Sequence, residues 1–194
     1  MATRTRERIL SSGLDLASVA GLSGVTLGVL AERVGMSKSG LFAHFKSKEQ
    51  VQLDLLDEMV RIGQAEIVAP AMKADDGLPR LRVLVERWLG WSGRAGLPGG
   101  CPLAAALFEM DDLDGPVRDK VIVLENAWRS ALASLVRAAA AAGHLRADVD
   151  VDQVVWELCG IYLSHHASLR LQRDPRADDR AHQAFEALIA RHRP

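Results

Sequence analysis

Cysteine is scarce in this chain of 194 residues. Its two cysteines, Cys101 and Cys159, lie far apart and lack the paired spacing of a zinc site, so no metal site is expected from them. Reduced thiols fit a cytoplasmic protein. No apolar run approaches the roughly 18 residues of a membrane span, and the N-terminal residues do not have the pattern of a signal peptide. We therefore expect no membrane association.

The chain also lacks a strong charge of one sign and has few aromatic residues. Its net charge is −1 and aromatic residues make up 5%. The charge is unevenly distributed, because residues 1–50 carry seven Lys or Arg against four Asp or Glu, a balance of +3. The remainder must then carry −4. A basic N-terminal region on an acidic remainder favours contact with nucleic acid through the N-terminal region.

Strand-like alternation of apolar and polar residues is absent, whereas apolar residues recur at helical spacing. The sequence predicts an all-α protein of about nine helices. We expect a three-helix helix-turn-helix domain at residues 1–47 and a larger helical domain at residues 48–194. Two short helices are predicted between residues 26 and 45, and the others cover residues 4–21, 47–72, 78–94, 102–110, 116–142, 152–172 and 178–192.

The stretch from Thr26 to Lys48 has the pattern of two short helices joined by a tight turn. Thr26 and Ser37 can each cap a helix start with a hydroxyl oxygen. Gly35 stands where the first helix must stop and the backbone needs a positive φ. Leu41 and Phe45, four residues apart, are expected to face inward. This pattern predicts a helix-turn-helix whose second helix enters the DNA major groove by its N-terminal end.

The residue types at that end suit a DNA groove. Lys38 and Ser39 can reach base edges or phosphates. Gly40 has no side chain and allows the backbone to approach DNA closely. Lys48 lies at the start of the next helix, where amides and an ammonium together suit a phosphate. Taken from spacing alone, an ordinary helical hairpin with solvated Lys and Ser remains the alternative.

The segment VTLGVLAERVGMSKSGLFAHFKSKEQ resembles the DNA-binding segment of the TetR-type (TetR/AcrR) transcriptional regulators. The resemblance runs from Ile9 and Leu10 to Leu53, roughly the first quarter of the chain. It is more specific than a bare helix-turn-helix. The positions that carry it are Ala31, Gly35, Ser37, Leu41, Phe42, His44, Phe45, Ser47, Lys48 and Glu49.

The resemblance implies a role for each position. Thr26 and Lys48 would each hold a phosphate. The groove would receive residues 37–40, namely Ser37, Lys38, Ser39 and Gly40. Phe42 and His44 would face the DNA backbone. Since Phe42 lacks the hydroxyl of the usual tyrosine, only apolar contact with a thymine methyl or a sugar remains there. Ala17 stands where a large aromatic residue is common, so the first helix must pack through Leu16, Leu22 and Leu27 instead.

The resemblance also implies a function and partners. The protein would be a transcriptional regulator, most often a repressor, and not an enzyme. Two copies would bind a palindromic operator in successive major grooves of double-stranded DNA. A small, largely apolar ligand bound in residues 48–194 would release the DNA. The helix at residues 47–72 would act as the lever that changes the separation of the two DNA-reading ends.

The helix at residues 152–172 is predicted to be apolar on two sides. One stripe consists of Val154, Leu158 and Ile161, and the other of Val155, Cys159, Tyr162, His166 and Leu169. A helix that is apolar on two sides is buried on two sides. One side can face the chain's own core, and a second copy of the chain is the simplest cover for the other. We therefore expect a homodimer formed by residues 116–142 and 152–172.

Several large side chains lie in the predicted C-terminal domain. They either pack its core or line an apolar cavity, where small molecules bind in all-helical proteins. The resemblance favours the cavity. The candidate ligand-binding residues are Trp88, Trp91, Phe108, Met110, Trp128 and Tyr162.

Other motifs give weaker signals. Residues 148–152 open like a calcium loop but lack its glycine and its final glutamate, so acidic residues at a helix start explain them better. The acidic residues from Glu109 to Asp114 form either a solvated turn or a cation site. The glycine-rich segment 93–102 lacks the Lys-Ser/Thr of a phosphate loop, and no cofactor is expected. The alternative functions are a small helical enzyme that uses His165 or the acidic cluster, and a protein-binding adaptor.

Overall fold

The computed structural model describes residues 2–194, with side chains from residue 4 onward, and that part of the chain is helical with no strand. The all-α prediction is therefore confirmed. The fold divides into two compact units. The first unit comprises Met1–Ile62 and Ser92–Leu124, and the second comprises Gly63–Trp91 and Glu125–Pro194. The boundary predicted at residue 47 concerns a functional division and stays a prediction.

In the first unit, Ile9, Leu10 and Leu14 of α1 (Ala2–Gly24) are buried. Ala17 is buried as well. Of the three leucines expected to pack beside it, Leu22 is fully buried, and Leu16 and Leu27 are half-buried. The backbone leaves helical geometry at Gly21, where φ is +73° and ψ is 172°. The predicted end of the helix at Gly21 therefore appears as a kink, after which the chain continues for three residues to Gly24.

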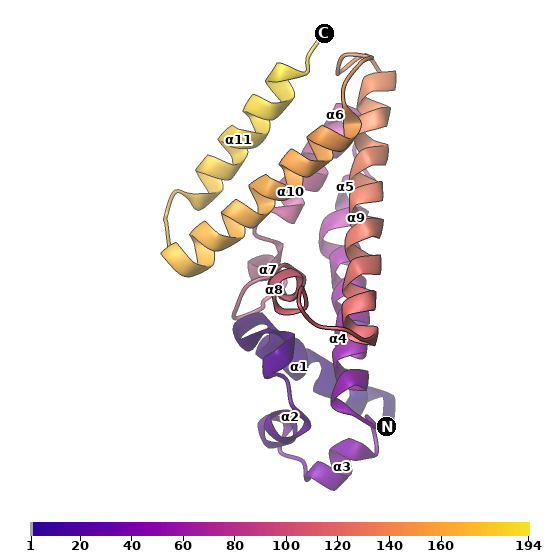
Figure 1. Ribbon diagram of the computed structural model, residues 1–194, viewed down its shortest axis with the longest axis vertical. Helices are drawn as coiled ribbons and strands as arrows, with labels where there is room; N and C mark the ends of the chain where they lie inside the picture. The colour runs from indigo at the N-terminus through magenta and orange to yellow at the C-terminus, as the bar shows by residue number, and fades with distance from the viewer. Residues whose placement is uncertain (1) are drawn as a thin grey trace. The chain divides into compact units, whose positions relative to one another are not determined.

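The two short helices of the predicted hairpin are α2 (Leu27–Val34) and α3 (Lys38–Phe42) (Figure 1). The Thr26 hydroxyl accepts a hydrogen bond from the Val29 amide, and the Ser37 hydroxyl accepts one from the Gly40 amide. Gly35 adopts the left-handed conformation, with φ +68° and ψ 33°. The local chemistry of caps and glycine thus fixes the turn, as predicted.

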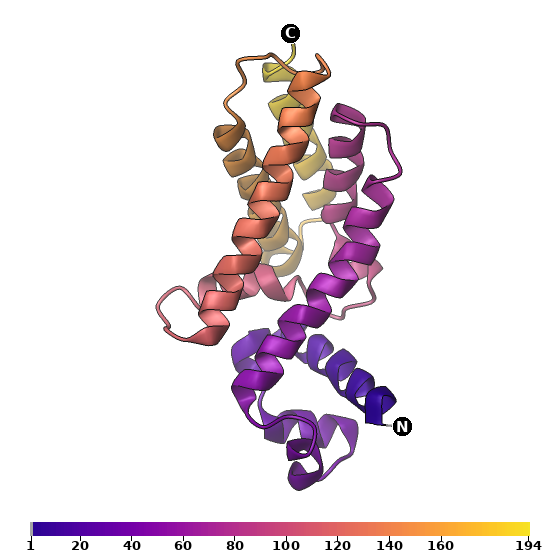
Figure 2. The ribbon, with the colours of Figure 1, turned by 90° about the vertical axis from the view of Figure 1, so that its right-hand side faces the viewer.

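The next helix, α4 (Lys48–Gly63), begins beyond a cap in which Ser47 accepts the Gln50 amide, and it rises past α1 (Figure 2). It continues through the π-helical turn η1 (Gln64–Val68) into α5 (Ala69–Ala71). The predicted helix at 47–72 is thus nearly continuous. Pro70 cannot donate to a carbonyl one turn back, and a π-helical turn is one way for a helix to absorb such a break.

One predicted helix is broken. Residues 78–94 form two helices, α6 (Leu78–Trp88) and α7 (Trp91–Arg94). Between them Leu89 is extended and Gly90 has a φ of +68°. The apolar side chains at 88, 89 and 91 led to the prediction of one helix. A left-handed Gly90 lets Leu89 and Trp91 both be buried from a break in the helix.

The rest of the chain follows the predicted order. α8 spans Pro102–Glu109, α9 spans Pro116–Ala141, α10 spans Val151–Ala167 with a π-helical turn η2 (Ser168–Gln172), and α11 spans Ala177–Arg191. α10 and α11 lie side by side and run in opposite directions in the second unit (Figure 1). Phe185, Leu188 and Ile189 of α11 are buried, as predicted. Among the helices described, none is both long and apolar enough to cross a membrane.

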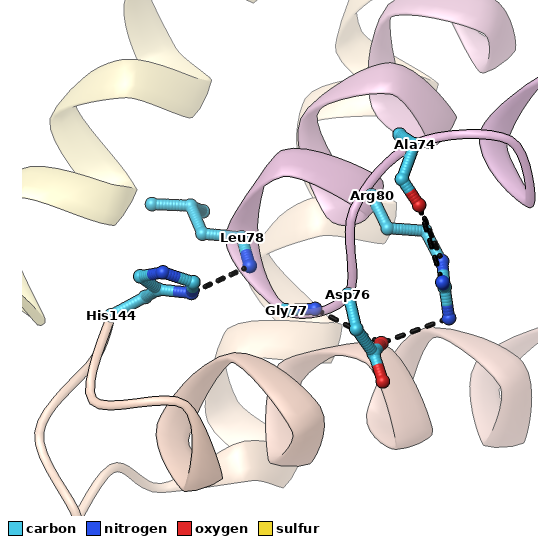
Figure 3. A network of polar contacts seen from close by, with 6 residues as sticks. All are labelled: Ala74, Asp76, Gly77, Leu78, Arg80 and His144. Carbon is cyan, nitrogen blue, oxygen red and sulfur yellow. Dashed lines mark hydrogen bonds and ion pairs between the residues drawn. The ribbon is translucent and has the colours of Figure 1, made fainter.

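The start of α6 is fixed by polar contacts within the second unit (Figure 3). The His144 Nδ1 atom accepts a hydrogen bond of 3.2 Å from the Leu78 amide, one of the amides that have no partner inside a helix. The Arg80 guanidinium binds the Asp76 carboxylate at 2.9 Å and the Ala74 carbonyl. The loop after α9 and the first turn of α6 are thereby held together.

The predicted stripes of α10 are buried inside the chain over most of their length. Val154 and Leu158 of one stripe, and Val155, Cys159 and Tyr162 of the other, are buried. Towards the C-terminal end Ile161 and His166 are half-buried and Leu169 is 38% exposed. Within the two stripes, only that end leaves apolar surface that a second copy of the chain could cover. The apolar group of α10 that stays open is Trp156, which is 65% exposed.

Candidate nucleic-acid interface and aromatic cluster

The tip of the hairpin presents polar groups on an apolar base. Leu41 and Phe45 are fully buried in the first unit, as predicted, and they hold α3 in place. On the outer side of the same short helix, Ser37, Lys38 and Ser39 are exposed. Since the inner residues set the orientation of the helix, the outer residues are presented in a fixed geometry.

The two serines of the tip differ in their freedom. The Ser37 oxygen caps α3 by accepting the Gly40 amide at 3.0 Å. The hydroxyls of Ser37 and Ser39 lie 3.0 Å apart, and either can donate to the other. Ser37 is therefore committed to the start of α3, whereas Ser39 keeps hydrogen-bonding capacity for a base edge.

Lys38 lies against the start of α2. A Cβ atom built on Gly28 would lie 3.4 Å from the Lys38 Cε atom, 3.8 Å from its Nζ atom and 3.9 Å from the Thr26 hydroxyl. The ammonium, the Thr26 hydroxyl and the amide end of α2 thus gather at one place, and such a combination attracts a phosphate. Gly28 was not among the predicted site residues. The signal in the sequence was a glycine in the first turn of a predicted helix. Glycine lowers helix stability, so its presence there suggests that another group lies too close for a side chain.

Phe42 and His44 follow α3. Phe42 is 52% exposed, so its ring is open to contact from outside. His44 is half-buried, and its ring lies 6.5 Å from that of the buried Phe45. An exposed aromatic ring at the end of α3 is compatible with the predicted apolar contact with DNA, which stays a prediction.

Lys48 has an internal partner. Its Nζ atom donates a hydrogen bond of 2.9 Å to the Ser23 carbonyl, although the residue is exposed at the start of α4. An ammonium carries three donors, so two remain for a phosphate. The intramolecular bond holds the ammonium beside the first turn of α4.

The arginines at the start of α1 are used differently from one another. The Arg6 guanidinium binds the Asp54 carboxylate at 2.6 Å and lies 5.3 Å from the centre of the Phe45 ring. Arg6 therefore fastens α1 to α4. Arg4 and Arg8 are exposed. If an arginine of this arm contacts phosphate, Arg4 and Arg8 are the candidates.

Four of the six predicted ligand-binding residues meet in the second unit. The Trp88 ring stacks on that of Tyr162 with centroids 4.2 Å apart, and its edge meets Trp128 at 5.0 Å. The Trp91 Nε1–H donates a hydrogen bond of 2.9 Å to the Tyr162 hydroxyl. We call these four residues the aromatic cluster. The contacts among these four residues agree with the interpretation that they pack the core.

One atom of the aromatic cluster has no such explanation. The Trp128 Nε1–H is buried and lacks a hydrogen-bond partner among the residues that the structure describes. Burial of an unpaired donor costs about 1–3 kcal/mol. The other two candidates lie on or directly after α8 in the first unit, where Met110 is buried and Phe108 is 66% exposed. Their role as ligand contacts stays a prediction.

The weaker motifs have local explanations. His165 is buried, and its Nε2 atom lies 2.7 Å from the Asp178 carboxylate, so a substrate cannot reach it from solvent. Asp150 caps α10 by accepting the Gln153 amide, as expected for acidic residues at a helix start. In the described part of the chain, His, Cys, Asp and Glu side chains form no group of three that could hold a metal ion.

Two family profiles match this sequence. "Bacterial regulatory proteins, tetR family" matches residues 9–55, and "Tetracyclin repressor-like, C-terminal domain" matches residues 77–185. The chain belongs to the TetR family. It is therefore a DNA-binding transcriptional regulator with a ligand-binding C-terminal domain, and neither profile describes an enzyme. A search of curated proteins found no match.

Solved structures share the fold. A TetR regulator from Chloroflexus aurantiacus superposes with a TM-score of 0.85 at 23% identity, over 97% of this chain and 94% of that one. A regulator from Saccharomonospora viridis in complex with choline gives 0.78 at 22%, over 97% and 96%. AibR in complex with isovaleryl coenzyme A and operator DNA gives 0.73 at 19%, over 93% and 98%. At these identities the similarity concerns the fold of this TetR-family chain and not its ligand.

Proposed function

We propose that this TetR-family protein is a repressor that binds a palindromic operator as a homodimer and leaves it when a small molecule binds the C-terminal domain. The observation that carries the DNA-binding part is the tip of α3. There Lys38 and Ser39 are exposed above the buried Leu41 and Phe45. Polar groups held rigidly on an apolar base are what groove recognition requires.

The residues of the tip divide into two classes of contact. Ser39 and Gly40 are proposed to read base edges, because they lie at the leading end of α3 and Ser39 retains hydrogen-bonding capacity. Thr26, Lys38 and Lys48 are proposed to hold phosphates. Phe42 and His44 would lie along the DNA backbone, and Ser37 would act mainly by capping α3. Phosphate contacts set the register and base contacts set the sequence preference.

The dimer is proposed to form through α9 and α10 on the face that carries Trp156. The ring of Trp156 is exposed, and one turn later Gly160 has open space where a side chain would stand. Several exposed residues of α9 are small, including Ala127, Ser130 and Ser134, and Arg137 is exposed beyond them. In a two-fold interface the same patch occurs twice. The Trp156 ring of each copy can therefore lie over Gly160 of the other copy.

The ligand is proposed to be small and largely apolar, with a hydrogen-bond acceptor. Support comes from the aromatic cluster and from the unpaired Trp128 Nε1–H. An acceptor atom that paired with this donor would remove its desolvation cost. Two related structures hold very different molecules, choline and isovaleryl coenzyme A, so the fold itself does not specify the ligand.

A salt titration of DNA binding tests the proposal. Duplexes are first selected from a randomised pool with the wild-type protein. Affinity for the selected duplex should fall linearly with the logarithm of salt concentration. Lys38→Ala should weaken binding to all duplexes alike and reduce the salt slope by about one, whereas Ser39→Ala should change the preference between duplexes.

Lys73→Ala is the matched control, because Lys73 is an exposed lysine of the second unit. It should leave both the affinity and the slope unchanged. If Lys38→Ala and Ser39→Ala bind every duplex as the wild type does, the assigned interface is wrong. Sedimentation of Trp156→Glu tests the dimer, with Val19→Glu, an exposed position on α1, as its control. Only the former should yield monomers.

A further inference from the structure

The last residues of α1, beyond its kink, have backbone groups that side chains of other helices bind. Gly21 has a φ of +73° and a ψ of 172°, so the three residues after it lie outside the hydrogen-bonding register of the preceding turns. The amide of Ser23 is therefore available to a side chain. The carbonyls of Leu22 and Ser23 lie in the last turn of α1, where carbonyls lack a partner inside the helix, and the Leu22 carbonyl also accepts the Val25 amide at 3.2 Å. Each of these three groups receives a bond from another helix of the first unit.

The first bond comes from α8. The Ser23 amide donates to the Glu109 carboxylate at 2.9 Å, across a sequence separation of 86 residues. The same carboxylate occupies the space beside Gly21, where a Cβ atom would lie 1.8 Å from the Glu109 Oε1 atom. Glu109, at the end of α8, thus reaches α1. Its carboxylate fits there because Gly21, at the kink, has no side chain.

The other two bonds come from α4. The buried Gln52 side chain donates from Nε2 to the Leu22 carbonyl at 2.8 Å, and the Lys48 ammonium donates to the Ser23 carbonyl at 2.9 Å. The Leu22 carbonyl and the Ser23 amide belong to one peptide group. Glu109 and Gln52 therefore hold the two sides of one planar unit, and the carbonyl that Lys48 binds belongs to the next peptide group along the chain.

We propose that Glu109 is a positioning residue for DNA binding, acting through the α1 kink on Lys48. Glu109 holds the Ser23 amide, the Ser23 carbonyl holds the Lys48 ammonium, and the ammonium stands beside the first turn of α4 where a phosphate is proposed to bind. This inference rests on the proposed role of Lys48 in the operator complex. It links a residue on a helix matched by the C-terminal family profile to a residue within the DNA-binding profile.

The physical effect is pre-organisation. A free lysine side chain loses rotamer entropy when it is fixed. Lys48 has lost part of that freedom before DNA arrives, because its ammonium is already bound. If the Ser23 carbonyl turns away, this advantage is lost, and binding weakens without any change at the DNA contact itself.

The first test needs no DNA. The NMR order parameter of the Lys48 Nζ group is measured in wild type and in Glu109→Ala, with Lys46, an exposed lysine in the loop directly before α4, as the internal reference. We expect the Lys48 value to exceed the Lys46 value in wild type and to fall to it in Glu109→Ala. Glu109→Gln keeps an acceptor oxygen and should stay near wild type. Asp112→Ala, a neighbouring exposed carboxylate, should change nothing.

The second test uses the selected duplex. Glu109→Ala should weaken binding by about 3–10-fold, within the range of entropy at stake. In a Lys48→Ala background, Glu109→Ala should leave the DNA affinity almost unchanged, because the ammonium on which Glu109 acts is absent. An unchanged Lys48 order parameter in Glu109→Ala, or equal effects of the substitution in both backgrounds, would overturn the inference. Absence of any specific duplex for the wild type would instead overturn the proposed function.

Discussion

The tip of α3 and the aromatic cluster are built on opposite rules. At the tip, side chains such as Lys38 and Ser39 face outward, and local caps hold the backbone. In the aromatic cluster, Trp88, Trp91 and Tyr162 are buried and hold one another. Substitutions at the outer face of the tip should therefore change DNA binding and leave the free energy of unfolding unchanged. Substitutions in the aromatic cluster should lower the free energy of unfolding and leave the DNA contacts unchanged.

The largest effect is expected at the centre of the aromatic cluster. Trp88→Ala removes the ring that contacts both Tyr162 and Trp128. The free energy of unfolding should fall by about 3–5 kcal/mol, as for other large-to-small changes in protein cores. Urea unfolding at equilibrium measures this change. A loss below 1 kcal/mol would mean that the cluster is not part of the stable core and would favour its role as an open ligand site.

The next effect comes from a hydrogen bond inside the cluster. Tyr162→Phe leaves the buried Trp91 Nε1–H without the hydroxyl that accepts it at 2.9 Å. An unpaired buried donor should lower the free energy of unfolding by about 1–3 kcal/mol. Trp128→Phe is the matched comparison, because the Nε1–H that it removes has no partner among the described residues. Thermal unfolding of both variants should show the greater loss for Tyr162→Phe, and the reverse order would contradict these contacts.

The sequence predicts these two regions unequally well for a physical reason. Thr26, Gly35 and Ser37 act on neighbours within a few residues, so local chemistry was enough to predict the turn. The stacking of Trp88 on Tyr162 joins residues 74 positions apart, and no local pattern specifies it. Sequence analysis gave the identities of the cluster residues but not the pairing among them.

The same limit explains the predictions that needed correction. Leu89 and Trp91 suggested a continuous helix, because apolar side chains on both sides of Gly90 look the same whether the helix continues or breaks. The bond from Ser23 to Glu109 had no signal beyond an acidic residue at a helix end. The apolar residues of α10 were identified correctly, but it was not predicted that the chain itself covers Val154, Leu158 and Tyr162.

A smaller effect is expected at the tip. Ser37→Ala removes the oxygen that caps α3 and leaves the Gly40 amide without its acceptor. Loss of an N-cap costs about 1 kcal/mol. Because α3 has five residues, we expect the loss to appear locally, as faster hydrogen exchange at the Gly40 amide. Ser39→Ala removes no cap and should leave that exchange rate unchanged. Equal exchange in the two variants would show that the cap does not stabilise the tip.

The smallest effect is a pH dependence confined to the aromatic cluster's own unit. Burial lowers the pKa of His166 below its usual value of 6.5, and the charges of Arg170 and His165 act in the same direction. The folded state therefore binds the proton more weakly than the unfolded state. The stability that comes from keeping His166 neutral is complete above pH 6.5. It is lost as the pH falls from 6.5 towards the lower pKa of the folded state.

His166→Gln should flatten this dependence, because glutamine does not titrate. Unfolding midpoints in urea are measured from pH 5 to pH 8 for both proteins. We expect the wild type to lose stability below about pH 6.5 and the variant to lose less of it. The order of DNA affinities among duplexes should not change with His166→Gln, since the residue belongs to α10 and not to the tip. Parallel pH profiles for wild type and variant would show that another group of the second unit carries the titration.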